Sequence, residues 1–156
     1  MARAWRPQTV SAYYPLGDEP DTLPLLSALA EFGFRVALPR TVSRLEPLQF
    51  CAWRPGEPLV RGPMKIWEPG AQATVVAPDL LFVPLAAFDR EGWRVGFGGG
   101  HYDRTLSRLR RVSHIRAVGV AFSVSEVPSA PAESHDEPLD YVLTENELID
   151  CSDARR

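Results

Sequence analysis

Short apolar runs alternate along this chain with segments of helical periodicity, and prolines or glycines separate them. The first run, residues 9–14, is rich in β-branched and aromatic residues and predicts a strand. Residues 21–34 carry apolar side chains at helical spacing, with Pro24 in the first turn and Gly33 near the end, and predict a helix. A second strand is predicted at 35–39. The N-terminal part of the chain therefore predicts a right-handed strand–helix–strand crossover.

The middle of the chain predicts an antiparallel excursion followed by a central strand. Residues 48–53 and those around Leu59 predict two antiparallel strands joined at a Pro-Gly turn. Residues 62–78 are interrupted by prolines and glycine and predict an irregular loop. Residues 79–85 form the most apolar run, which predicts a central strand covered on both faces.

The remaining segments repeat the alternation of helix and strand. Residues 102–111 carry leucines at helical spacing and predict a helix, while 115–122 predict a buried strand. Residues 123–132 predict a linker or short helix, and 141–144 predict a last short strand. The order predicts an α/β fold: an open, mostly parallel sheet with helices on both faces, a Rossmann-like three-layer sandwich, plus a small antiparallel hairpin excursion.

Composition narrows the class of protein. The 156 residues are 45% hydrophobic and 24% charged, which predicts one soluble globular domain over residues 1–156. The net charge of −3 lacks the basic excess typical of nucleic-acid binding, and no apolar stretch approaches the roughly 20 residues of a membrane span. The two cysteines show neither metal nor disulfide spacing, which favours a cytoplasmic protein. We expect a monomer or a weak homodimer.

The strongest chemical signal lies at 84–104, where an apolar strand leads through a glycine-rich loop into a helix. Its glycines let the backbone approach an anion closely, and the N–H groups at a helix start favour negative charge. Arg94 adds a positive charge, and Asp103 can hold a cation beside a phosphate. The loop matches neither a P-loop nor the Gly-x-Gly-x-x-Gly pattern. By itself, the glycine cluster also fits a tight strand-to-helix connection.

The complete string is more specific. Pro-Leu-x-Ala-Phe-Asp-x-x-Gly-x-Arg-x-Gly-x-Gly-x-Gly-x-Tyr-Asp-Arg resembles the signature of the 5-formyltetrahydrofolate cyclo-ligase (methenyltetrahydrofolate synthetase) family. The turn at 17–22, the Ile-Trp-Glu-Pro segment at 66–69 and the Pro-Ala-Glu-Ser-His-Asp segment at 131–136 also resemble this family, in the same order. The resemblance implies conversion of 5-formyltetrahydrofolate to 5,10-methenyltetrahydrofolate with MgATP, through phosphorylation of the formyl oxygen and release of ADP and phosphate.

The resemblance also implies roles for individual residues. The ATP loop would comprise Arg94, Val95, Gly96, Phe97, Gly98, Gly99, Gly100, His101 and Tyr102. The groups acting on the transferred phosphoryl group would be Arg94, Gly98, Gly99 and Gly100. The reduced folate would contact Tyr14, Glu19, Phe97, Gly98, Gly99, Gly100 and His101, with Glu19 accepting pterin N–H groups. Mg²⁺ would be held by Asp103 and Asp136.

Each assignment has a structural alternative. Asp103 suits a first helical turn, where the helix dipole stabilises a carboxylate, and Asp136 suits an ordinary turn. Most family members carry a basic helix before the first strand, where this chain has about nine residues, so we expect that helix to be missing. Two other functions stay open: a folate- or nucleotide-binding regulatory homologue without turnover, and another enzyme on a related α/β scaffold.

Overall fold

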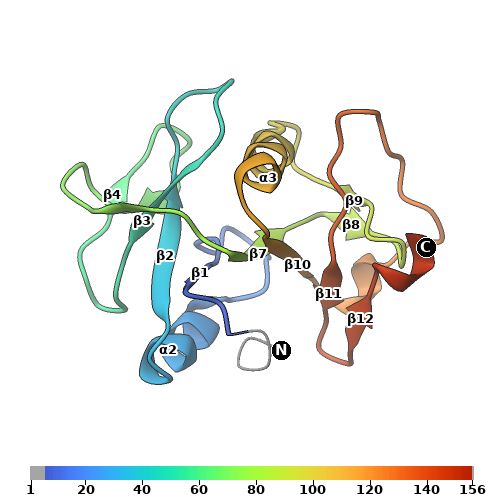
Figure 1. Ribbon diagram of the computed structural model, residues 1–156, viewed down its shortest axis with the longest axis horizontal. Coiled ribbons are helices and arrows are strands. Elements are labelled where there is room, and N and C mark those ends of the chain that lie inside the picture. Colours follow the sequence, from blue (N-terminus) through green and yellow to red (C-terminus); the bar gives the residue numbers. More distant parts are fainter. Residues whose placement is uncertain (1–5, 156) are drawn as a thin grey trace.

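The computed structural model describes residues 6–155 and contains one eight-stranded sheet (Figure 1). Its inner strands run parallel, in the spatial order β11 (Tyr141–Leu143), β10 (Arg116–Val120), β7 (Leu80–Pro84), β1 (Thr9–Ser11) and β2 (Arg35–Arg40). Antiparallel strands extend both edges, namely β3 (Gln49–Ala52) and β6 (Val75–Val76) beyond β2, and β12 (Leu148–Asp150) beyond β11. The open, mostly parallel sheet is therefore confirmed.

One α-helix covers each face of this sheet (Figure 1). Helix α2 (Leu23–Glu31) packs Leu26 into one buried cluster, and α3 (His101–Val112) packs Leu106 into the other. Successive side chains of a strand point to opposite faces, so Leu80 of β7 joins the α2 cluster and Leu81 joins the α3 cluster. The expected three layers, with a central strand buried on both faces, are confirmed.

The turn between β1 and α2 is fixed by its own side chains. The Thr22 hydroxyl donates to the Tyr13 carbonyl at 2.6 Å, and the Tyr13 hydroxyl donates to the Pro20 carbonyl at 2.9 Å. The backbone N–H of Leu23, at the start of the helix, donates to Asp21 Oδ1 at 3.0 Å. These bonds set the path of the turn that leaves the carboxyl end of β1.

The antiparallel excursion differs from the prediction. β3 pairs with β6, Phe50 opposite Val76, whereas β4 (Val60–Arg61) pairs with β5 (Trp67–Glu68). The strands predicted at 48–53 and near Leu59 therefore do not pair with each other, and the loop predicted at 62–78 contains β5 and β6. Strands of two residues are too short for the alternating pattern that identifies a strand in a sequence.

Smaller differences concern the ends and edges of elements. The first strand ends at Ser11, three residues before its predicted end, because the chain leaves the sheet there and enters the turn. The hairpin of β8 (Ala87–Phe88) and β9 (Arg94–Val95), and strand β12, are not predicted. A 3₁₀-helix at Ser123–Ser125 agrees with the predicted linker or short helix. The expectation that the family's basic N-terminal helix is missing concerns the residues before the first strand, of which 1–5 lie outside the described residues.

Among the described residues, no helix has the length and apolar character needed to cross a bilayer. Helix α3 is the longer of the two described α-helices, with 12 residues. The sheet edge where its N-terminus lies carries the candidate site.

Candidate functional site

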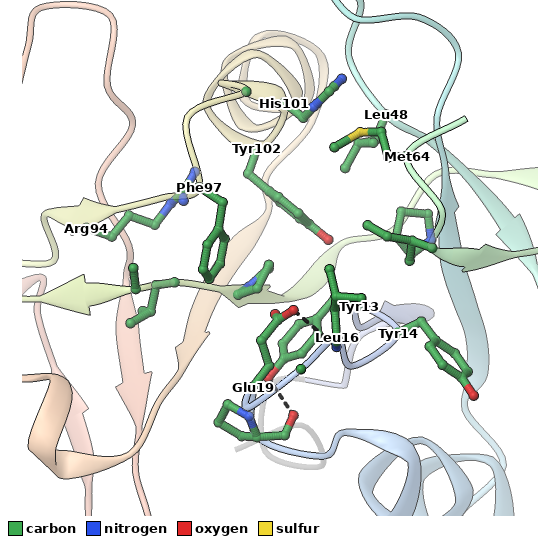
Figure 2. A pocket seen from close by; sticks show the side chains of 18 of the residues that line it. Tyr13, Tyr14, Leu16, Glu19, Leu48, Met64, Arg94, Phe97, His101 and Tyr102 are labelled. Carbon is green, nitrogen blue, oxygen red and sulfur yellow. Dashed lines mark hydrogen bonds between the residues drawn. The ribbon is translucent and has the colours of Figure 1, made fainter. Parts of the chain in front are cut away.

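A cavity of about 640 Å³ opens at the carboxyl ends of the parallel strands (Figure 2). Its walls come from the segments that end or follow β1, β2, β7 and β10, together with the β4–β5 hairpin and the start of α3. Open α/β sheets bind ligands at this edge. The predicted site residues that line the cavity are Tyr14, Glu19, Arg94, Phe97, Gly99, Gly100, His101, Tyr102 and Asp103. Val95, Gly96, Gly98 and Asp136 are not part of its lining.

The glycine-rich loop brings an uncapped helix N-terminus to the cavity. Gly100 is the N-cap residue of α3 with φ +69°, and no side chain caps the helix there. Gly98 has φ +95°, a left-handed conformation that glycine adopts without steric cost. A Cβ at Gly99 would lie 3.0 Å from Nδ1 of the His101 ring, so the loop is also crowded from within. The first-turn N–H groups of α3 are therefore presented at this edge without a side-chain cap, as anion binding requires.

Arg94 is a buried cation beside this loop. Its side chain is 6% exposed, and Nη2 lies 3.4 Å from Oδ1 of Asp103. Its Nε is buried and has no hydrogen-bond partner among the described residues. Burial lowers the pKa of Arg94, and the negative charge of Asp103 opposes that shift. A buried guanidinium with one long ion pair and an unpaired N–H is suited to receive an anionic ligand.

Tyr102 lies between Arg94 and the turn after β1. The Arg94 guanidinium carbon is 5.9 Å from the centre of the Tyr102 ring. Figure 2 shows the ring extending from α3 into the cavity, with its hydroxyl group directed toward Leu16. That hydroxyl is buried without a hydrogen-bond partner among the described residues, and burial raises the pKa of Tyr102. The cavity therefore has a second buried donor that a ligand can satisfy.

The loop between β2 and β3 is fastened to the start of α3. His101 Nε2 lies 3.1 Å from the Ser43 carbonyl oxygen. Arg104 Nη2 donates to the carbonyl oxygens of Arg44 at 2.8 Å and Gly99 at 2.9 Å. His101 is thus engaged as an anchor for this loop while its ring borders the cavity, a role that the sequence pattern did not indicate.

The two predicted metal ligands occupy different surroundings. Asp103 lines the cavity, and its Oδ1 accepts the backbone N–H of Glu137 at 3.1 Å as well as Arg94. Asp136 lies outside the lining, and its Oδ2 accepts the N–H of Glu133 at 2.8 Å. Its negative charge is one of those that oppose the lowering of the Arg94 pKa by burial. No group of three or more metal-binding side chains occurs within residues 6–155.

The turn after β1 forms the wall opposite the helix. Glu19 Oε1 accepts the backbone N–H of Leu16 at 3.2 Å (Figure 2). Burial raises the pKa of Glu19, and the Leu16 hydrogen bond opposes the shift. Tyr14 borders the cavity, and Figure 2 shows its hydroxyl directed away from Tyr102. Glu19 is therefore placed to accept hydrogen bonds from a ligand, while Tyr14 offers mainly its ring.

Several lining residues were missed by the sequence analysis. The β4–β5 hairpin contributes Met64, Ile66 and Glu68, and the segment after β10 contributes Phe122. Residues 66–69 carry a family resemblance, which was the one available signal for Glu68. The hairpin reaches the site only through tertiary packing, because β5 contacts β2. Local pattern alone could not place it there.

An open parallel sheet with an anion-binding loop at its carboxyl edge is typical of α/β proteins that bind phosphate-bearing ligands. The family model described as the 5-formyltetrahydrofolate cyclo-ligase family matches residues 2–145, and the chain belongs to that family. It is 37% identical over 148 residues to a 5-formyltetrahydrofolate cyclo-ligase of Mycolicibacterium smegmatis, covering 88% of this chain and 73% of the relative.

Other relatives agree with this assignment. A 5-formyltetrahydrofolate cyclo-ligase of Escherichia coli is 37% identical over 149 residues, which cover 90% of this chain and 79% of that protein. The NMR structure of Aquifex aeolicus 5,10-methenyltetrahydrofolate synthetase superposes with a TM-score of 0.76 at 29% sequence identity. That likeness covers 94% of this chain and 73% of the other. The family suggested by the sequence motifs is therefore confirmed.

Proposed function

We propose that this protein converts 5-formyltetrahydrofolate to 5,10-methenyltetrahydrofolate, using MgATP and releasing ADP and phosphate. The observation that carries the proposal is the buried Arg94, with an unpaired Nε, beside an uncapped, glycine-led helix start. This arrangement lies in a cavity of a chain that belongs to the cyclo-ligase family. Such an enzyme must mainly position two ligands and neutralise charge on a transferred phosphoryl group.

The proposed reaction has three steps: phosphorylation of the formyl oxygen, ring closure and release of phosphate. The formyl oxygen of the folate attacks the γ-phosphorus of ATP, the bond to the β,γ-bridging oxygen breaks, and ADP leaves. The resulting N5-iminium phosphate is attacked by N10, which closes the five-membered ring. Phosphate then leaves with the former formyl oxygen, and N10 loses its proton. No covalent bond to the protein is required, so the residues of the chain bind, orient and stabilise charge.

On the nucleotide side, Arg94 donates its N–H groups to phosphate oxygens, where a forked guanidinium fits well. The backbone N–H groups of Gly98, Gly99 and Gly100 approach the transferred phosphoryl group, since no Cβ obstructs them. The rest of the proposed ATP loop consists of Val95, Gly96, Phe97, His101 and Tyr102. Gly96 supports this arrangement, because a Cβ there would lie 2.9 Å from Arg94 Nη1.

On the folate side, the proposed contacts are Tyr14, Glu19, Phe97, Gly98, Gly99, Gly100 and His101. The carboxylate of Glu19 accepts a pterin N–H, as its position in the cavity wall allows. Phe97 is 67% exposed beside the cavity, so its ring offers an apolar surface to the ligand. The shared glycines bring the formyl group and the γ-phosphate together.

We assign Mg²⁺ to Asp103 and Asp136. Magnesium in phosphoryl-transfer sites is held by one or two carboxylates together with substrate phosphates, so two carboxylates suffice. Asp103 fits because it lines the cavity beside Arg94. When bound, the ion neutralises negative charge on the phosphates. We further propose that the protein acts in the cytoplasm as a monomer or weak homodimer, with neither nucleic acid nor membrane as partner. Cys51 and Cys151 are both buried thiols outside any disulfide, which supports a reducing compartment.

The test is an ATP-dependent turnover assay that follows methenyl product and ADP together. We expect both to form in equal amounts, and only when 5-formyltetrahydrofolate, ATP and Mg²⁺ are all present. Absence of product at saturating ligand contradicts the proposal. Calorimetry on the same sample then separates a folate- or nucleotide-binding homologue, which releases binding heat without product, from a protein that binds neither.

A further inference from the structure

A further carboxylate, that of Glu68, lines the cavity on the side of the β4–β5 hairpin. Glu68 is 6% exposed and lines the cavity. Its Oε2 accepts the backbone N–H of Thr41 at 3.1 Å. The chain makes space for this group, because a Cβ at Gly62 would lie 2.3 Å from the Glu68 carboxyl carbon. The carboxylate is therefore held in one place by its surroundings.

This carboxylate makes a single hydrogen bond among the described residues, through Oε2, and Oε1 is not one of the fully buried unpaired atoms. Within residues 6–155, no cationic side chain lies within ion-pair distance of Glu68, and Thr41 provides its one side-chain hydrogen bond. The charges of Arg40 and Glu68 both act on the Cys51 thiol, which places them in one neighbourhood. The Arg40 guanidinium, however, donates to the Gly70 carbonyl and to Gln49 Oε1. A buried carboxylate normally receives several hydrogen bonds or an ion pair, so donors from a ligand would complete this one.

We propose that Glu68 is a specificity-determining residue that accepts hydrogen bonds from the 2-amino and N3–H groups of the pterin ring. The inference rests on the proposed folate substrate. Two adjacent N–H donors on a planar ring match the two oxygens of a carboxylate, and such charge-assisted pairs are strong. Oε1 accepts one of these donors, and Oε2 accepts the other at its second lone pair, beside the Thr41 N–H.

Burial distinguishes the roles of Glu68 and Glu19. The glutamate tail of the folate is anionic and leaves the site toward solvent, and it is attached to the ring far from the 2-amino group. The distal edge of the pterin therefore meets the more buried of the two carboxylates. Glu19 is partly exposed, whereas Glu68 is 6% exposed. Glu68 thus accepts hydrogen bonds from the distal edge of the pterin ring, and Glu19 accepts one from a different N–H group of that ring.

The test compares two ligands with the full chain. One is 5-formyltetrahydrofolate, and the other is its analogue with a methyl group in place of the 2-amino group. Dissociation constants are measured by calorimetry without ATP, and melting temperatures are recorded for every variant. In Glu68→Gln, the amide oxygen can still accept the Thr41 N–H while the amide NH₂ replaces the free acceptor, so the fold is retained. Glu57→Gln, on an exposed turn outside the cavity lining, is the control.

We expect the wild-type protein to bind the parent folate about 10- to 100-fold more tightly than the methyl analogue. Glu68→Gln loses that discrimination and binds both ligands with similar, weak affinity. Its KM for MgATP and its melting temperature are unchanged. Glu57→Gln behaves as wild type, and Glu19→Gln weakens both ligands while keeping the discrimination.

Four outcomes would contradict the role of Glu68, the proposed turnover, or both. If Glu68→Gln still binds the parent folate more tightly than the methyl analogue, the role of Glu68 is contradicted. It is also contradicted if the variant has a lowered melting temperature and its affinity for both ligands falls by the same factor. Folate binding that depends on Glu68 without ATP-dependent product contradicts the proposed turnover and supports the role of Glu68. Wild-type protein that binds no folate contradicts both.

Discussion

Arg94 combines burial, a fixed charge and a planar set of donors. Lysine would keep the charge but lose the forked geometry, so the two residues are not equivalent at such a site. We expect Arg94→Lys to raise the KM for MgATP by about 10- to 100-fold, the effect of losing a charge-assisted hydrogen bond of ~1.5–3 kcal/mol. Arg90→Lys is the matched control, because Arg90 is exposed and pairs with Glu126 and Glu147. Equal kinetics for both variants would remove Arg94 from the nucleotide site.

Asp103 offers a second test at the same scale. Its position in the first turn of α3 alone explains a stabilisation of ~0.3–1 kcal/mol through the helix dipole. If it also holds Mg²⁺, Asp103→Asn lowers kcat at least about 10-fold and raises the Mg²⁺ concentration needed for half-maximal rate. Steady-state rates over a Mg²⁺ titration check this. An unchanged Mg²⁺ dependence with a slightly lowered melting temperature would leave Asp103 only its structural role.

The raised pKa of Glu19 predicts a pH-dependent effect on stability. Burial is the main cause of the shift, so the folded protein holds this proton more tightly than the unfolded chain. Stability therefore falls as pH rises from the ordinary glutamate pKa through the raised one. Glu19→Gln removes this dependence and can keep the Leu16 hydrogen bond. Its melting temperature should exceed that of wild type near pH 7 and match it near pH 4. The exposed Glu31→Gln should show no such trend.

At the scale of elements, the role proposed for the glycine-rich loop in ATP binding can be separated from ordinary backbone strain. Gly98 and Gly56 have φ +95° and +96°, and an added Cβ meets nothing within 4 Å at either position. Alanine at each should cost a similar ~1–2 kcal/mol of folding free energy, measured by denaturant unfolding. We expect Gly98→Ala alone to weaken ATP binding, because Gly56 belongs to the turn closed by the Glu57–Arg54 hydrogen bond and not to the proposed ATP loop. Weakened ATP binding in both variants, or in neither, would contradict a specific role for the loop.

A substitution at Gly99 tests how closely the ATP phosphates approach the backbone, without adding left-handed backbone strain. Its φ is not in the left-handed region, and an added Cβ would meet the His101 ring at 3.0 Å. Gly99→Val should therefore raise the dissociation constant for ATP by more than about 10-fold, since branched methyl groups occupy the path of the phosphate. Calorimetry measures this directly, and circular dichroism verifies that α3 is retained. Normal ATP affinity would place the phosphates elsewhere.

The length of each element decides whether it could be predicted from the sequence. β2, β7, β10 and both α-helices come from long apolar or periodic runs, and their existence was predicted with small boundary errors. β4, β5, β6, β8 and β9 have two residues each, so no period can be recognised in them. Their pairing is decided by tertiary contacts. The glycine-rich loop was predictable because glycine and a following helix leave a local signature, whereas Glu68 reaches the site on one of these short strands.

At the scale of the whole molecule, the site exists because parallel strands end at one edge. Glu19 follows β1, Glu68 ends β5 and Arg94 lies in β9, and the sheet brings these distant parts of the chain around one cavity. The sequence could place the loops at this edge through the rule for α/β sheets. The sequence could not predict that Arg94 Nε lacks a hydrogen-bond partner or that His101 anchors the loop between β2 and β3, because both features depend on packing between segments.

The proposed binding of two ligands in one cavity predicts linked stabilisation of the whole fold. A ligand at 100 times its dissociation constant stabilises the folded state by ~2.7 kcal/mol, which raises the melting temperature of a chain of this size by roughly 5–10 °C. We expect 5-formyltetrahydrofolate and a non-hydrolysable MgATP analogue each to give such a rise. In Arg94→Lys the rise in melting temperature with the nucleotide should shrink while the rise with the folate persists. In Glu68→Gln the rise with the folate should shrink while the rise with the nucleotide persists. Thermal scans of these variants at fixed ligand concentrations check this. Loss of both rises in either variant would show that the two parts of the cavity are not separable, and no rise in wild type would place both ligands outside it.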